Sequence, residues 1–181
     1  NIIYLHQTKH IEESYEKFGF VKKRKYLTPL EAKCDNIDRT TEEAIEPKIY
    51  QSLIGCLNYW AVCCRPDLAF AVCYLAQRNK QPTTYDIDQA VRCLNHVHNT
   101  KTKALIFRSS GDNLDNRGSC SLKVYIDSSF ANADKRRSVF GYVVIMDEMV
   151  IHCKSKMTPM VCLSVTEAEF IAITLGLKDL E

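Results

Sequence analysis

The spacing of apolar side chains follows a helical period in the first part of the chain and a strand period in the last part. Between residues 49 and 64, apolar residues recur every three or four positions, until the Arg-Pro-Asp sequence at 65–67 ends the stripe. The next helix begins near Pro66 and is apolar nearly all round, so it should be buried. A third helix with one apolar face follows, capped by Thr83 or Thr84. The region therefore predicts three consecutive helices.

Three further features precede these helices. Residues 11–19 place apolar side chains on one face, with acids early and Gly19 at the end, which predicts a short helix. The basic run 22–25 is compatible with a phosphate-contacting patch, a localisation signal or an ordinary solvated loop. The acidic, polar stretch 34–47 is typical of a linker.

Beyond residue 103 the pattern predicts strands. Short runs of β-type residues occupy 104–107, 121–127, 141–146 and 149–154. The last two flank an Asp-Glu pair, which suggests a hairpin although this is not a favoured two-residue turn. A helix is expected from Ser164 onward. The order of three strands and a helix predicts an α/β fold that starts with an antiparallel sheet.

Composition narrows the function only a little. The formal net charge is +2, so binding to nucleic acid must be argued from local groups of Lys and Arg. No uncharged run is long enough for a membrane span, and no signal peptide is expected. The nine cysteines include no C-x-x-C pair and no zinc-ligand spacing, so we expect free, buried thiols in a reducing compartment. Because the chain starts at Asn1 without a Met, we also expect it to be part of something longer.

Two glutamates at the start of the last helix are candidates for chemistry. Ser164 and Glu167 have the spacing of a capping box, which gives Glu167 a structural task. Glu169 is rotated by about 200° from Glu167, so the two cannot act as a pair on one face. Small residues beside Glu169 would let the helix approach a sheet, where Asp127 at a strand end is the natural partner. The alternatives are that Glu169 is a solvated helix charge and that Asp127 only leads into a turn.

The C-terminal part of the sequence resembles the ribonuclease H domain of copia-type retrotransposon polyproteins. The elements that carry this resemblance are "YIDSSFA", "ADKRRSVFGY", "CKSKMTP" and "LSVTEAEF". Upstream, "YQSLIGCLNYW" and "RPDLAFAV" are similar to the thumb region of the same family's reverse transcriptase, and "IIYLHQTKHIEESYEKFGF" with "TPLEA" to the segment before it. The resemblance covers most of the chain in the family's order.

The resemblance implies a division into three parts. Residues 1–48 would be the end of the reverse transcriptase domain with a linker, 49–107 a helical thumb and connection segment, and 120–181 a ribonuclease-H-like domain truncated at its C-terminus. The fold expected is therefore α/β, with a helical segment followed by a truncated ribonuclease-H-like sheet. The polymerase motif of the family would precede residue 1.

The resemblance also implies a nuclease site of four carboxylates that hold two Mg²⁺ ions and cut the RNA strand of an RNA–DNA hybrid. Asp127 and Glu169 match two of these carboxylates, and the other two would follow the last helix. The basic residues expected to contact nucleic acid are Lys135, Arg136, Arg137, Lys154 and Lys156. The expected partners are nucleic acid and the rest of the polyprotein, in cytoplasmic virus-like particles or the nucleus, without membrane or secretion.

Several positions depart from the family's pattern, none of them an expected metal ligand: Ser129, Phe130, Val139, Cys153 and Phe170. They suggest a divergent copy. With two of four carboxylates, the isolated chain is expected to have negligible nuclease activity, because Mg²⁺ requires near-ideal octahedral oxygen coordination. The alternative function is that of a catalytically dead, domesticated or decaying fragment that only binds nucleic acid or a protein partner.

Overall fold

The computed structural model describes residues 1–19, 24–32, 34, 41–108, 120–131 and 136–179. Helices and strands both occur in these ranges, which confirms the expected α/β class. The chain divides into two compact units. The helical unit comprises His6–Ala104, and the sheet unit comprises Asn1–Leu5 together with Leu105–Glu181. The three-part division drawn from the sequence stays a prediction.

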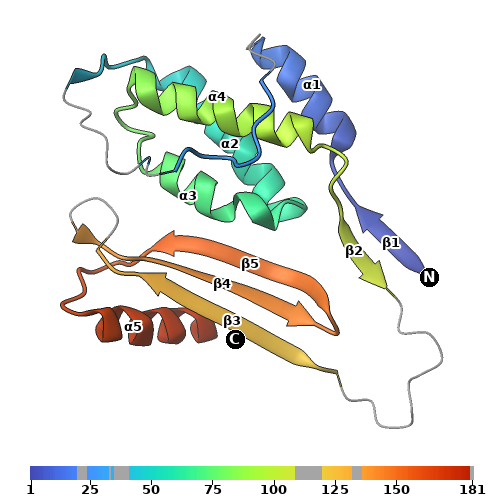
Figure 1. The fold of residues 1–181 in the computed structure, drawn as a ribbon, viewed down its shortest axis with the longest axis vertical. Helices are drawn as coiled ribbons and strands as arrows, with labels where there is room; N and C mark the ends of the chain where they lie inside the picture. Colours follow the sequence, from blue (N-terminus) through green and yellow to red (C-terminus); the bar gives the residue numbers. More distant parts are fainter. Residues whose placement is uncertain (20–23, 33, 35–40, 109–119, 132–135, 180–181) are drawn as a thin grey trace. The chain divides into compact units, whose positions relative to one another are not determined.

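The three helices expected in the helical unit are confirmed as α2 (Pro47–Cys63), α3 (Ala69–Ala76) and α4 (Thr84–Asn99) (Figure 1). Pro66 begins a short 3₁₀ helix, η3 (Pro66–Leu68), directly before α3. Thr83 is the N-cap of α4 and forms a complete capping box with Asp86, which settles the choice between Thr83 and Thr84.

The first helix of this unit, α1, spans Thr8–Phe18, so it starts one turn earlier than the sequence indicated. Its end is as expected: Gly19 adopts the left-handed conformation with φ of 62° and closes the helix. The core against which these helices pack consists of large residues that are fully or nearly fully buried: Ile11, Tyr50, Leu53, Leu57, Trp60, Leu68, Leu75, Leu94 and Val97.

The sheet unit contains the expected antiparallel sheet. Strands β3 (Leu122–Ser129), β4 (Val139–Met146) and β5 (Met149–Met157) lie in that order, and helix α5 (Val165–Lys178) follows them. The hairpin between β4 and β5 is confirmed. Its turn residues Asp147 and Glu148 take positive φ angles of 47° and 64°, as a primed two-residue turn requires.

A second, two-stranded sheet was not anticipated. Strand β1 (Ile2–Leu5) pairs antiparallel with β2 (Leu105–Arg108), so that Ile2 lies opposite Arg108. The sequence indicated β2 but gave no sign of β1, because four consecutive apolar residues at a chain start lack the alternation that marks a strand. The pairing joins residues about one hundred positions apart.

Helix α5 lies directly on the sheet formed by β3, β4 and β5. Ala168 and Ala172 are fully buried, as expected for small residues that let a helix approach a sheet. Gly176 comes closer still, because a Cβ atom at that position would lie 2.8 Å from Cδ1 of Ile126. The helix is therefore held at a distance that only small residues allow.

The nine cysteines are free, but their burial differs from the expectation of uniformly buried thiols. Cys34, Cys64, Cys93 and Cys162 are buried, whereas Cys120 is exposed just before β3. Within the described residues, no helix is long and apolar enough to cross a membrane.

Candidate functional site

Asp127 lies near the C-terminal end of β3, where its side chain is exposed. Its Oδ1 accepts a hydrogen bond of 2.9 Å from the backbone N–H of Ser128. Asp127 pairs with Gly141 across β4, whereas its neighbour Ile126 packs against α5. Because successive side chains of a strand point to opposite faces, the strand directs Asp127 away from the face that α5 covers.

Glu169 lies in the first turns of α5 and is half-buried. The cap expected at this helix start is present, since the Oγ of Ser164 accepts a hydrogen bond of 3.1 Å from the N–H of Glu167. The carboxylate of Glu167 accepts from the N–H of Leu163, so it serves the helix start in a variant of the expected box. Among the described residues, no hydrogen bond or ion pair engages Glu169. Of the two glutamates, Glu169 is therefore the one available for chemistry.

The packing of α5 on β3 sets the two candidate carboxylates relative to each other. In Figure 1, α5 runs along the sheet in the direction opposite to β3. Gly176 stands against Ile126, and seven helical residues carry Glu169 roughly 10 Å from there, toward the Ser129 end of β3. Asp127 lies toward that same end. The structure thus brings both residues to one end of the sheet. Because side chains alternate along β3, Asp127 points to the face that α5 does not cover.

These residues do not make up a magnesium site by themselves. Among the described residues, no group of three or more His, Cys, Asp or Glu side chains is placed to hold a metal ion. Mg²⁺ needs close octahedral coordination by oxygen atoms, and two carboxylates from different elements do not supply it.

A buried polar network at this end of the sheet was not foreseen. Ser138 and Thr158 are fully buried at the ends of β4 and β5. The N–H of Thr158 donates to the carbonyl oxygen of Ser138 at 2.8 Å, and the N–H of Ser138 donates to the hydroxyl of Thr158 at 3.2 Å. The N–H of Ala131 donates to the hydroxyl of Ser138 at 3.2 Å. The network ties the segment after β3 to β4 and β5 and so fixes the strand end that bears Asp127.

The basic residues expected to contact nucleic acid are differently placed. Lys154 and Lys156 pair with Tyr142 and Phe140, so all four point to the face that α5 covers in part. Lys154 is engaged, because its Nζ lies 2.6 Å from Oδ2 of Asp179, whereas Lys156 is exposed.

The other expected basic residues lie near the start of β4 or outside the described part of the chain. Arg136 is exposed with a φ of 57°, and Arg137 is partly buried. Lys135 lies outside the described residues, as do Lys22 and Lys23 of the basic run.

Asp179 also holds Tyr142, whose hydroxyl donates to Oδ2 at 3.0 Å and contacts Nε2 of His152 at 2.9 Å. Burial and the neighbouring Asp179 carboxylate raise the pKa of Tyr142 well above its usual value. The hydrogen bonds from Lys154 and Tyr142 lower the pKa of Asp179. Asp179 therefore stays ionised and offsets the charge of Lys154, which leaves Lys156 as the better candidate for a phosphate contact.

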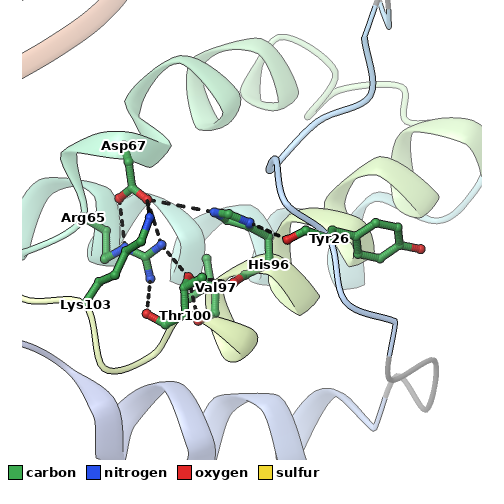
Figure 2. Close-up of polar contacts among 7 residues, drawn as sticks. All are labelled: Tyr26, Arg65, Asp67, His96, Val97, Thr100 and Lys103. Atoms are coloured by element: carbon green, nitrogen blue, oxygen red, sulfur yellow. Dashed lines mark hydrogen bonds and ion pairs between the residues drawn. The ribbon is translucent and has the colours of Figure 1, made fainter.

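The helical unit holds a second polar cluster, centred on Arg65 (Figure 2). Arg65 is almost fully buried, and its Nε and Nη2 each donate to Asp67 at 2.8 Å. The same guanidinium donates to the hydroxyl of Thr100 at 2.8 Å and to its carbonyl oxygen at 3.2 Å. These contacts hold the end of α4 against the turn before η3. The sequence indicated only a helix stop at this turn.

Two further side chains complete the Arg65 cluster. The Nζ of Lys103 lies 3.5 Å from Oδ2 of Asp67, and the Nε2 of His96 lies 4.0 Å from the same oxygen. Burial alone would raise the pKa of Asp67, but the hydrogen bonds and charge of Arg65, with a contribution from Lys103, outweigh it and lower the pKa. The cluster is a polar network within the helical unit that links the turn before η3 to the end of α4.

The chain was compared with family models, solved structures and curated proteins. No family model and no solved structure matches the chain. An uncharacterised mitochondrial protein of Arabidopsis thaliana is 30% identical over 98% of this chain and 71% of its own length. The Pol polyprotein of transposon TNT 1-94 from Nicotiana tabacum is 30% identical over 98% of this chain. That of transposon RE1 from Arabidopsis thaliana is 27% identical over 94% of it.

The chain belongs to the family of the retrotransposon Pol polyproteins, which confirms the resemblance found in the sequence motifs. It spans 13% of the TNT 1-94 polyprotein and 11% of the RE1 polyprotein.

Proposed function

We propose that this chain is the part of a copia-type Pol polyprotein that joins the reverse transcriptase thumb to ribonuclease H. In the intact parent, Asp127 and Glu169 would act in the hydrolysis of the RNA strand of RNA–DNA hybrids during reverse transcription. The observation that carries the proposal is the packing of α5 on β3, which leads both residues to one end of the sheet, with Asp127 on the face away from α5. Glu167 is excluded from the chemistry because it serves the helix start.

Mg²⁺ is the cofactor of the proposed parent enzyme, with Asp127 and Glu169 as the ligands that this chain contributes. The described residues do not complete the ion's coordination. Further carboxylates must therefore come from elsewhere in the parent. The proposal includes nucleic acid and the rest of the polyprotein as partners, and cytoplasmic virus-like particles or the nucleus as the place of action.

A chimera provides the direct test. The chain replaces the aligned segment of the TNT 1-94 polyprotein, and cleavage of a labelled RNA–DNA hybrid is measured with Mg²⁺. Asp127→Asn and Glu169→Gln should each lower the rate by more than about a hundredfold, since even indirect partners of metal ligands are worth roughly 10- to 100-fold. Glu167→Gln is the matched control and should retain activity, because Gln also serves as a cap. Equal losses in all three variants would contradict the assignment.

The isolated chain is a second test of the same proposal. It should show negligible cleavage of the hybrid in the presence of Mg²⁺, since its described residues do not complete a metal site. Robust Mg²⁺-dependent cleavage by the 181-residue chain alone would overturn this expectation.

The second candidate function is binding of nucleic acid without catalysis, as in a domesticated or decaying copy. The exposed Lys156 and Arg136 favour it. Binding to a hybrid should then weaken steeply with salt. Lys156→Gln should lower the slope of log K against log salt by about 1, whereas Lys154→Gln should change it less because Asp179 already neutralises Lys154. Binding that does not depend on salt would exclude this function.

A further inference from the structure

Helix α5 buries three small residues and exposes three large ones, while the large Leu175 is partly buried against the core of the sheet unit. Ala168, Ala172 and Gly176 face the sheet, whereas Phe170, Ile173 and Leu177 are 67%, 43% and 53% exposed. An amphipathic helix that serves only its own core has the reverse arrangement, with large apolar residues facing inward. The exposed residues therefore contribute little to the core of the sheet unit.

The three exposed residues form one continuous surface, here called the outer stripe. Phe170, Ile173 and Leu177 are spaced three and four positions apart, as in a coiled-coil seam, and so lie on one side of the helix. Thr174 adjoins them, and its hydroxyl donates to the carbonyl oxygen of Phe170 at 2.8 Å. The outer stripe thus presents no charge and no unpaired hydroxyl donor. One turn before Phe170, the exposed Thr166 lies in line with the outer stripe and ends its apolar part.

Two side chains of opposite charge lie along one side of the outer stripe, one near each end of α5; this side is called the flank below. Glu167 lies near the start of α5 and Lys178 at its end. Eleven residues at about 100° each bring Lys178 to within about 20° of the direction of Glu167. If a second copy of α5 lies antiparallel to the first, the same flanks meet, and Glu167 of each copy faces Lys178 of the other. The charge pattern is therefore complementary to itself.

We propose that the outer stripe binds a second copy of the chain through an antiparallel pair of α5 helices. Glu167 and Lys178 set the orientation, because only the antiparallel pair brings Glu167 of one copy against Lys178 of the other. The stripe itself disfavours nucleic acid as the occupant, since its three residues are apolar and supply no cation for a phosphate. The paired surface is small in comparison with a standard interface of about 1,600 Å², so the dimer is weak.

Sedimentation equilibrium of the full chain at increasing concentration measures this association. Phe170→Glu should weaken dimerisation by roughly tenfold or more, because it replaces the stripe's one aromatic side chain, of a type often found at interface hot spots, with a charge. Tyr125→Glu is the matched control: Tyr125 is 59% exposed, but it lies on β3 and not on α5. Circular dichroism establishes that both variants are folded.

Charge exchange tests the antiparallel orientation. Glu167→Lys and Lys178→Glu should each weaken self-association, whereas a mixture of the two variants should form the hetero-pair, in which every Lys faces a Glu. A chain that stays monomeric at all concentrations overturns the proposal, and so does association that Phe170→Glu leaves unchanged. Variants that fail to recover on mixing overturn the antiparallel pair.

Discussion

The two units of the molecule place their large apolar side chains in opposite ways. In the helical unit, Trp60, Tyr50 and Leu57 are completely buried, and the core extends over all four helices. In the sheet unit, the buried cluster is small and centres on Phe140 and Tyr142. Its helix α5 exposes Phe170, Ile173 and Leu177 to solvent. The helical unit thus has the larger buried core. The sheet unit bears the candidate carboxylates, and its helix packs on the sheet through small residues.

Because the helical unit has the larger buried core, we expect a substitution at the centre of that core to lower the free energy of unfolding the most. Trp60→Ala should lower the free energy of unfolding by about 3–5 kcal/mol, because it removes a fully buried ring and leaves a cavity. It also removes the hydrogen bond of 2.9 Å that the indole N–H donates to His10. Urea denaturation followed by circular dichroism measures the change. Val62→Ala, at a position 76% exposed on the same helix, should stay within about 0.5 kcal/mol; a similar loss there would contradict the burial argument.

The Arg65 cluster should give the next largest effect. Asp67→Asn leaves a buried guanidinium without its anionic partner, so we expect a loss of about 2 kcal/mol at neutral pH. Because the pKa of Asp67 is lowered in the folded state, its contribution is complete above the unfolded pKa of about 3.9 and is lost as the pH falls through the folded value. The difference between wild type and variant should therefore shrink below about pH 4.

An exposed ion pair supplies the control for this prediction. Glu46 and Lys48 are 3.8 Å apart, and their side chains are 69% and 88% exposed. Glu46→Gln should change stability by no more than about 1 kcal/mol, since such pairs contribute little. A difference between wild type and Asp67→Asn that stays constant from neutral to acid pH would count against an ionised, stabilising Asp67.

The sequence predicted those features of both units that depend on neighbouring residues. The helical period gave α2, α3 and α4, and the spacing of Ser164 and Glu167 separated the capping glutamate from Glu169. The sequence did not predict contacts between residues that are far apart along the chain. The pairing of β1 with β2 and the hydrogen bonds between Ser138 and Thr158 follow from the tertiary fold.

The candidate site shows the same limit. The sequence indicated Asp127 and Glu169 as partners, but the face of the sheet toward which Asp127 points depends on the register with Gly141. A shift of one residue would turn the side chain to the other face. The burial of Arg65 could not be predicted from the sequence either, because a charged residue beside a Pro is typical of a surface turn.

The close packing of the sheet unit gives the third prediction. Gly176→Val should destabilise the sheet unit by about 1–2 kcal/mol, because a Cβ there lies 2.8 Å from Ile126 and 3.6 Å from Tyr142. Gly176→Ala is the milder variant: the end of the Ile126 side chain can rotate, and the better helix propensity of Ala offsets the contact. Hydrogen exchange of the α5 amides measures both. Equal protection in the Val variant and wild type would show that α5 is not held close to β3.

The smallest expected effect has the opposite sign and comes from the helical unit. Gly55 lies on the exposed side of α2, and a Cβ at that position would meet no atom within 4 Å. Gly55→Ala should therefore raise the free energy of unfolding by about 0.5–1 kcal/mol, because Ala loses less conformational entropy in a helix. Urea denaturation measures it alongside Gly176→Ala, which makes the same exchange at a crowded helical position. If both glycines gave the same gain, the close approach of α5 to its sheet would not be what distinguishes the two units.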